Sequence, residues 1–225
     1  MFHRLLLFAT IFQLINSQYD KEKDECRNSS ETCTPNPDDI IDTQEDLPWE
    51  ERVNMATRFF NHKLVPDLIG LPPRSRCHAW FPGLLKPARV VVGGELARRD
   101  LFYPPHNMSW KYIPDHLYTV FLTTPDFTTT TNFTNWRQLH HLLLINVKNC
   151  YIDTGDIVLD YLIPQIVRAA GYTRYAFLVY EQPDRIPVPQ IKRNGLNATF
   201  TLKQFVQKHN LGNPKFGNYF FIYYE

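Results

Sequence analysis

The sequence predicts a mainly β fold with peripheral α-helices, and three observations support this prediction. Aromatic residues make up 14% of the 225 residues, with 12 Tyr and 16 Phe, and aromatic side chains favour strands. The chain has 17 Pro but only 9 Gly, a balance typical of short strands joined by loops rather than of a helical bundle. Several apolar runs, such as residues 142–145 and 176–179, are continuous, which indicates strands covered on both faces.

The charge balance excludes a nucleic-acid partner held by phosphate contacts. Lys and Arg number 24 and Asp and Glu number 23, so the net charge is +1 and no polybasic surface is available. Hydrophobic residues at 44% and charged residues at 21% are ordinary values for a globular chain and exclude a fully disordered or fibrous protein. We therefore expect a globular monomer that binds no nucleic acid.

The first 17 residues are typical of a secretory signal peptide. A short basic start at His3 and Arg4 precedes an apolar run over residues 5–15, which is too short for the ~20 residues that cross a bilayer. Cleavage near Ser17 would release a secreted, extracellular protein. Four N-x-[ST] sites for glycosylation agree with export, at Asn28, Asn107, Asn132 and Asn197.

The four cysteines favour disulfide bonds. They form an even set without a C-x-x-C motif, as expected in an oxidising compartment. Of the three possible pairings, we expect one bridge between Cys26 and Cys33 and another between Cys77 and Cys150. The alternative is that one or more are buried free thiols.

Residues 18–46 form a polar N-terminal arm, and the folded domain is expected over residues 47–225. The domain begins with a helix that Asp46 can cap and that ends near His62. Its apolar residues recur at spacings of three or four, which predicts an amphipathic helix with Trp49, Val53, Ala56 and Phe60 on its buried face.

Short strands should follow this helix, separated by Pro-containing loops. We expect them over residues 77–81, 89–92, 118–123, 140–147, 174–180 and 218–224. A short helix over residues 201–209 should place Leu202, Phe205 and Val206 on one face.

Catalytic motifs are missing from the sequence. It contains no G-x-S-x-G, no Walker-type glycine loop and no H-E-x-x-H. His140 and His141 are adjacent, but successive side chains of a strand point to opposite faces, so the pair cannot hold one ion from a strand. We therefore expect no enzymatic activity, no metal site and no cofactor, although one of the two histidines could line a cavity.

Three blocks together resemble the phosphatidylethanolamine-binding protein family. They are YTVFLTTPD ending at Asp126, HHLLLIN ending at Asn146 and GYTRY ending at Tyr175, beside the family's D-P-D-x-P, H-W-L-V-x-N and G-x-H-R-Y motifs. The resemblance extends over about residues 46–225. It implies a central antiparallel β-sheet packed against a smaller sheet, with a small pocket that holds phosphate or a phospholipid headgroup.

The departures from the family motifs fall in that pocket. The first Asp of the turn motif is Thr124, and the His of the third motif is Thr173. The resemblance implies a ligand-binding set of His141, Tyr175, Trp136, Thr124, Thr173 and Pro125. Asp126 and Arg174 both remain, and we expect them to form a salt bridge that braces the pocket wall. Gln165 and Ile166 carry bulk toward the pocket where the family has smaller residues.

Two functions follow from this resemblance. The first is a secreted binding protein with an altered pocket, which takes a phosphate-bearing headgroup weakly or a more neutral small molecule. The second is a regulator that acts through its surface on an extracellular protein partner, such as a serine protease inhibitor or a modulator of signalling. A third interpretation is a pocket without present use.

Overall fold

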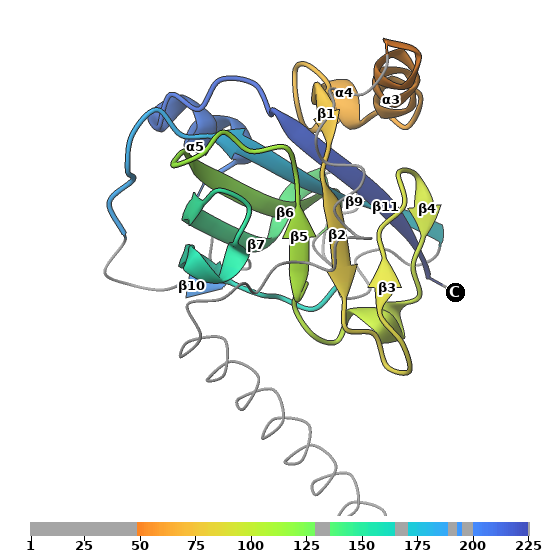
Figure 1. The fold of residues 1–225 in the computed structure, drawn as a ribbon. Coiled ribbons are helices and arrows are strands. Elements are labelled where there is room, and N and C mark those ends of the chain that lie inside the picture. The colour runs from red at the N-terminus through yellow and green to blue at the C-terminus, as the bar shows by residue number, and fades with distance from the viewer. Residues whose placement is uncertain (1–48, 129–135, 165–170, 189–192, 195–199, 225) are drawn as a thin grey trace, which may run out of the picture. The chain divides into compact units, whose positions relative to one another are not determined.

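A large β-sheet forms the centre of the protein in a computed structural model (Figure 1). The structure describes residues 49–128, 136–164, 171–188, 193–194 and 200–224, with the backbone alone for residues 49, 51, 52, 128, 136, 137, 193 and 194. The main sheet has the order β1-β11-β9-β6-β7-β8-β10, and β4 also pairs with β11. Its strands are β1 (Ser75–Arg76), β4 (Gly94–Glu95), β6 (Leu117–Thr128), β7 (Trp136–Lys148), β8 (Asp156–Asp160), β9 (Gly171–Glu181), β10 (Arg193–Asn194) and β11 (Phe216–Tyr224).

Neighbouring strands in the middle of this sheet are antiparallel. The pairs β11–β9, β9–β6, β6–β7 and β7–β8 all run in opposite directions, as the resemblance implied. The two-residue strands β1, β4 and β10 join in parallel, so the sheet is mixed at its margins.

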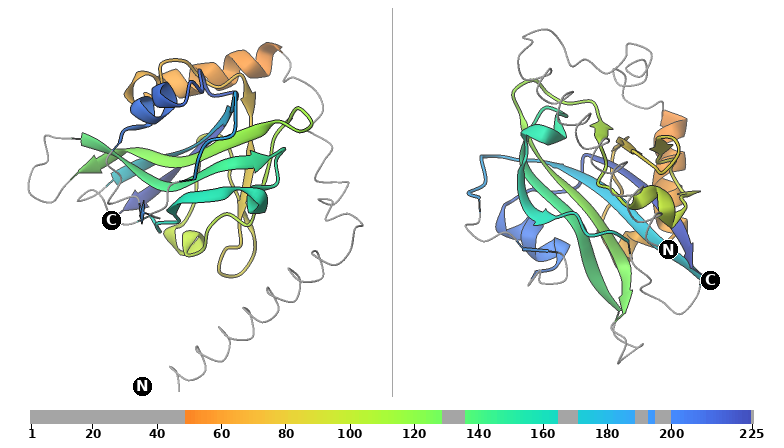
Figure 2. Two further views of the ribbon diagram at one scale, coloured as in Figure 1. Left: turned by 90° about the vertical axis from the view of Figure 1, so that its left-hand side faces the viewer. Right: turned by 90° about the horizontal axis from the view of Figure 1, so that it is seen from below.

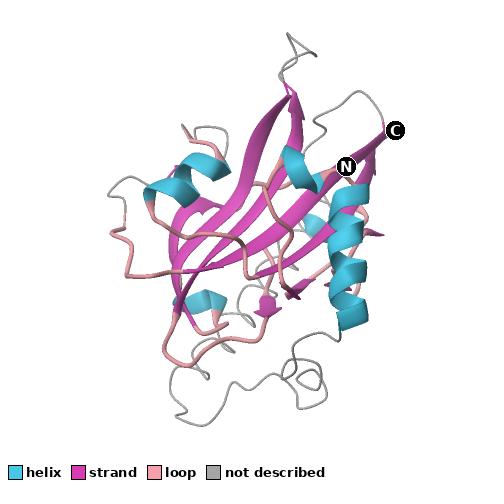
Figure 3. Cartoon of the chain, turned by 90° about the horizontal axis from the view of Figure 1, so that it is seen from above, coloured by secondary structure: helices cyan, strands magenta, loops and turns pink. Residues whose placement is uncertain are grey.

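The two faces of the main sheet have different covers (Figures 2 and 3). One face carries the helices α3 (Trp49–Asn61), α4 (Leu64–Asp67) and α5 (Leu202–Lys208). The other carries a small sheet of order β3-β2-β5, formed by Ala88–Arg89, His78–Phe81 and Asn107–Ser109, together with the 3-10 helix η1 (Arg98–Leu101). A second 3-10 helix, η2 (Ile152–Thr154), follows β7.

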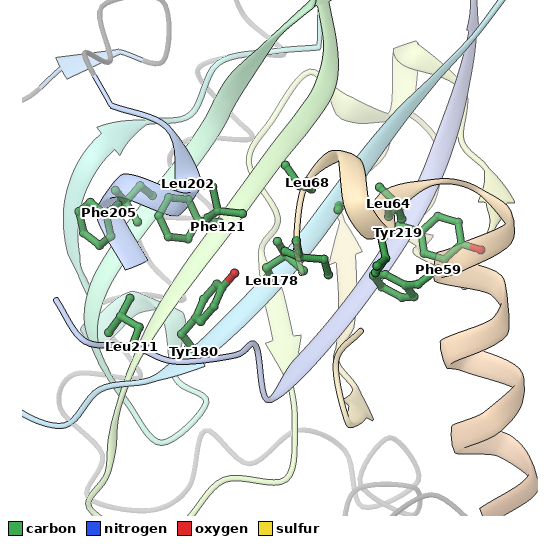
Figure 4. Close-up of a cluster of buried hydrophobic side chains, with 14 of the residues drawn as sticks. Phe59, Leu64, Leu68, Phe121, Leu178, Tyr180, Leu202, Phe205, Leu211 and Tyr219 are labelled. Carbon is green, nitrogen blue, oxygen red and sulfur yellow. The ribbon is translucent and has the colours of Figure 1, made fainter. Parts of the chain in front are cut away.

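Each cover closes its own hydrophobic core, and strand β9 contributes to both. Ala176, Leu178 and Tyr180 face the helices, whereas the alternate residues Tyr175, Phe177 and Val179 face the small sheet. Figure 4 shows the helix-side core, where Phe59 and Phe205 pack on the same face of the sheet. The continuous apolar runs of the sequence are therefore strands buried on both faces, as predicted.

The predicted elements agree with the structure in part, and the short elements α4, β1, β4, β5, β10, η1 and η2 were not predicted. The buried face of α3 is wrong: Val53 and Phe60 are 43% and 50% exposed, and Met55 and Phe59 enter the core instead. The strand expected over residues 89–92 ends at Arg89, β8 was not predicted, and β6 extends well past its predicted end. Helix α5 agrees closely, because Thr201 caps it in a capping box with Gln204 and its apolar residues pack inward.

The disulfide expected between Cys77 and Cys150 is not formed. Both residues are free thiols, with Cys77 buried and Cys150 partly buried. Cys77 lies in the small-sheet core, where a thiol packs as a small apolar side chain, and burial raises its pKa far above the usual value. Cys26 and Cys33, the predicted signal peptide and the predicted polar arm lie outside the described residues. Within the described part of the chain, no helix is both long enough and apolar enough to cross a bilayer.

Candidate functional site

A β-bulge in strand β7 places His141. Leu122 of β6 pairs with Leu142 and the next residue, Thr123, pairs with His140, so His141 is an extra residue without a partner in the register. Bulges of this kind redirect side chains and are frequent next to binding sites. As a result His141 faces the small-sheet side, and His140 faces the helices, as expected for two adjacent residues of a strand.

His141 and Tyr175 meet on the small-sheet side. Their ring centroids lie 5.1 Å apart with the planes at 63°, and both side chains are fully buried. His141 Nδ1 lies 2.7 Å from the carbonyl oxygen of Leu162. Because a carbonyl oxygen only accepts, Nδ1 carries the proton and Nε2 presents a bare lone pair. Nε2 is buried and has no hydrogen-bond partner among the described residues.

The Tyr175 hydroxyl belongs to a pair of phenols. It lies 2.9 Å from the hydroxyl of Tyr224 in β11, and either oxygen can donate. Burial raises the pKa of both groups above the ordinary value, so both stay neutral at physiological pH. The Tyr175 ring also stacks on Phe220 at 5.4 Å. This packing fixes the orientation of the Tyr175 hydroxyl.

The two threonines that replace the family's acidic residue and histidine have different environments. Thr173 lies two residues before Tyr175 on the same face of β9, and its buried hydroxyl has no partner in the described ranges of the chain. The Thr124 hydroxyl instead accepts a hydrogen bond from the backbone N–H of Asp126 at 3.0 Å, with the buried Pro125 between them. The hydroxyl of Thr124 therefore stabilises the local backbone, and that of Thr173 remains available.

Asp126 and Arg174 form the expected salt bridge. The Asp126 carboxylate accepts from the backbone N–H of Arg174 at 2.8 Å and from its Nε at 2.9 Å, and Nη2 completes the contact. Arg174 Nη1 also donates to Asp67 at 2.9 Å and to the His62 carbonyl at 2.8 Å. Although burial alone lowers the pKa of Arg174, the two carboxylates raise it above the usual value. This network joins β6 and β9 to the connection after α3.

His140 forms a contrast to its neighbour, because both of its ring nitrogens have partners. Nε2 lies 3.3 Å from the Phe200 carbonyl oxygen and therefore carries the proton. Nδ1 lies 3.0 Å from the Thr123 hydroxyl, which can donate to it. Burial lowers the pKa of both histidines to about 4, so both are neutral at physiological pH.

The structure thus brings together three of the six predicted binding residues on one face, namely His141, Tyr175 and Thr173. Thr124 and Pro125 lie in β6, at the register shift between Thr124 and Phe127. Trp136 begins β7, but its side chain lies outside the description, as do Gln165 and Ile166. Tyr224, whose hydroxyl pairs with that of Tyr175, was not among the binding residues predicted from the sequence. The alternation of β11, in which Phe220, Ile222 and Tyr224 share a face, could have indicated it.

Of the four predicted glycosylation sites, one lies in the described part of the chain. Asn107 lies in β5 and is partly exposed, whereas Asn28, Asn132 and Asn197 fall outside the described residues. In the described ranges, no group of three His, Cys, Asp or Glu residues has the arrangement of a metal site.

Known proteins related in sequence include one from Drosophila melanogaster and one from Toxocara canis. No family model matches the chain. It is 27% identical over 162 residues to a Drosophila melanogaster protein with the provisional name odorant-binding protein A5, over 70% of this chain and 75% of that protein. It is 26% identical over 166 residues to the 26 kDa secreted antigen of Toxocara canis, covering 72% of this chain and 62% of the antigen. The match thus spans less than two thirds of the antigen's length.

Solved structures give the same fold. The phosphatidylethanolamine-binding protein from Plasmodium vivax aligns with a TM-score of 0.60 and 16% identity, over 76% of this chain and 98% of that one. The carboxypeptidase Y inhibitor, solved in complex with its cognate proteinase, aligns with a TM-score of 0.61 and 20% identity, over 77% and 97%. The resemblance of the three sequence blocks is therefore confirmed, and this chain has the fold of the phosphatidylethanolamine-binding proteins.

Proposed function

We propose that this chain is a secreted, non-catalytic binding protein that takes a small ligand beside His141 and Tyr175. One observation carries the proposal: two buried polar atoms on this face of the sheet, His141 Nε2 and Thr173 Oγ1, have no hydrogen-bond partner within the part of the chain that the structure describes. Buried polar groups in proteins are almost always paired, because an unpaired group loses its hydration without compensation. A bound ligand would supply the missing partners.

The state of His141 suits binding better than catalysis. Its Nδ1 proton is engaged by the Leu162 carbonyl, and its low pKa keeps the ring neutral. A general base works best with a pKa near the working pH, and a value of about 4 is far from it. His141 is therefore suited to accept a hydrogen bond from a ligand and to hold it in place.

Secretion is supported by the apolar segment over residues 5–15 and by the match to a secreted antigen. The family name suggests a phosphate or a phospholipid headgroup as the ligand, and the provisional name of the Drosophila protein suggests a small odorant.

Calorimetry with a matched pair of variants tests the proposal. We would titrate the purified protein with inorganic phosphate, short-chain phosphatidylethanolamine and hexanol, and repeat each titration with Thr173→Val and Thr123→Val. We expect at least one probe to bind, with affinity reduced about tenfold in Thr173→Val and unchanged in Thr123→Val, whose hydroxyl faces the helices. Absence of heat from all three probes at millimolar concentration would contradict a ligand site here.

A second candidate function is inhibition of a protease. The carboxypeptidase Y inhibitor has the same fold and was solved with its proteinase bound, which supports a surface-acting inhibitor. A panel of secreted serine proteases, assayed with the wild-type protein and with Thr173→Val, would test this. Inhibition that persists in Thr173→Val would assign the activity to the surface and away from the buried hydroxyl. A panel in which no protease is inhibited would exclude the candidate for those enzymes.

A further inference from the structure

We propose that the ligand of this site is electrically neutral and donates an O–H or N–H group to His141 Nε2, as an alcohol does. This inference rests on the proposed binding function and specifies the chemistry of the ligand. It follows from the tautomer that the fold imposes on His141 and from the hydroxyl groups around it. It also follows from the ion pairs that already hold the neighbouring charged side chains.

The tautomer is set by the backbone. The Leu162 carbonyl lies 2.7 Å from Nδ1, and the backbone N–H of Leu162 donates to the His141 carbonyl at 2.7 Å. The two residues are thus joined by a main-chain and a side-chain hydrogen bond. Moving the proton to Nε2 would place two lone pairs against each other at the Leu162 contact. Nε2 therefore accepts and cannot donate while the ring is neutral.

The hydroxyl groups complete a pattern that an alcohol can satisfy. Tyr175 and Tyr224 share one hydrogen bond, so one phenolic proton of the pair stays uncommitted. The Thr173 hydroxyl, which can donate or accept, is also uncommitted. The face thus offers one acceptor without a proton and up to two hydroxyl donors. A ligand hydroxyl donates one bond and accepts others, which matches this set.

An anion finds a poorer match. The Nε2 lone pair repels a phosphate oxygen, and protonation of His141 is opposed by its burial. The nearby carboxylate of Asp126 also disfavours negative charge at this site, since it helps to raise the pKa of the Tyr175 phenol. Arg174 cannot compensate, because it is held by Asp126 and Asp67. Arg98 lies near Tyr224, but it is exposed and its Nε donates to the Pro164 carbonyl.

A cation is disfavoured for the complementary reason. A buried ammonium group needs a carboxylate beside it, because desolvation of an unpaired charge costs several kcal/mol. The nearby carboxylate is that of Asp126, which already accepts four hydrogen bonds from Arg174. It is therefore not available to pair with a ligand cation. Neutral donors avoid both penalties.

The test combines ligand titration with a direct reading of the ring protons. Hexanol, inorganic phosphate and O-phosphoethanolamine would each be titrated into the wild-type protein and into the matched variants His141→Phe and His140→Phe. Long-range proton–nitrogen NMR of the wild-type protein would report which nitrogen of His141 carries the proton, before and after each addition. The NMR measurement needs no variant, so it still tests the inference if a variant fails to fold.

We expect hexanol to bind with His141 neutral and protonated on Nδ1, with about tenfold weaker affinity in His141→Phe and no change in His140→Phe. Phosphate or phosphoethanolamine that binds tightly and protonates Nε2 would overturn the inference of a neutral ligand, while the proposed binding function would stand. A site that takes none of the probes would overturn both.

Discussion

The two faces of the main sheet differ in how they treat buried polar groups. On the helix-covered face, His140 has partners at both ring nitrogens and Arg174 has partners at several of its N–H groups. On the face covered by the small sheet, His141 Nε2, Thr173 Oγ1 and the indole nitrogen of Trp110 have no partner among the residues that the structure describes. The helix side is therefore a satisfied core, whereas the small-sheet side carries uncommitted polar atoms, which a ligand could use.

This difference separates stability from function within one sheet. Removing a partnered group breaks existing hydrogen bonds, and the free energy of unfolding should fall. Removing an unpartnered group breaks none, so its loss should affect binding and leave stability nearly unchanged. The following predictions use this distinction, beginning with the largest expected effect.

Acidification should destabilise the protein through both histidines. Burial lowers the pKa of each from an ordinary 6.5 to about 4, so below pH 6.5 the unfolded chain binds protons that the folded protein does not. Their contribution is complete above pH 6.5 and is lost as the pH falls toward about 4. The free energy of unfolding should drop by roughly 1.4 kcal/mol per pH unit for each histidine.

Urea unfolding at several pH values between these limits would measure the slope. His140→Phe and His141→Phe should each reduce the slope of the unfolding free energy against pH by the amount expected for about one proton. This reduction separates the two histidines from the carboxylates that titrate in the same range. A variant with the wild-type slope would show that the histidine it replaces is charged in the folded protein.

Loss of the Asp126 carboxylate should have the next largest effect. Asp126→Asn leaves Arg174, whose side chain is 17% exposed, without its main partner, and we expect a loss of about 3 kcal/mol and a lower melting temperature. The matched control is Asp67→Asn, at a carboxylate that is 40% exposed and should cost less than about 1 kcal/mol. Equal melting temperatures for Asp126→Asn and the wild type would refute a bracing role for the bridge.

Most of the fold could be predicted from local sequence patterns. Continuous apolar runs such as residues 176–179 indicated strands buried on both faces, and the spacing of Leu202, Phe205 and Val206 predicted α5. The buried face of α3 was predicted wrongly because two apolar stripes compete on that helix. Tertiary packing selected Met55 and Phe59, which enter the helix-side core where Phe59 contacts Tyr219, over the stripe of Val53 and Phe60. Helical spacing alone cannot decide between them.

The candidate site could be predicted only in part. The family resemblance selected His141 and Tyr175, which the structure places in contact. The bulge that turns His141, the Leu162 carbonyl that fixes its proton and the hydroxyl of Tyr224 all depend on pairings between distant strands. The expected bridge between Cys77 and Cys150 failed for a related reason. An even number of cysteines indicates disulfides, but the three-dimensional positions of the thiols decide whether a given pair can form.

The smallest expected effect is also the sharpest comparison of the two faces, because it uses the same substitution on each. Thr123→Val removes a buried hydroxyl whose single proton can be donated to His140 Nδ1 at 3.0 Å or to the Leu139 carbonyl at 3.1 Å, and should cost about 1 to 2 kcal/mol. Thr173→Val removes a buried hydroxyl without a partner and should leave the free energy of unfolding unchanged or raise it by up to about 1 kcal/mol. Chemical denaturation at neutral pH without ligand would measure both. Equal losses in the two variants would mean that the Thr173 hydroxyl has a partner in the free protein, and the argument for a ligand at that atom would then fail.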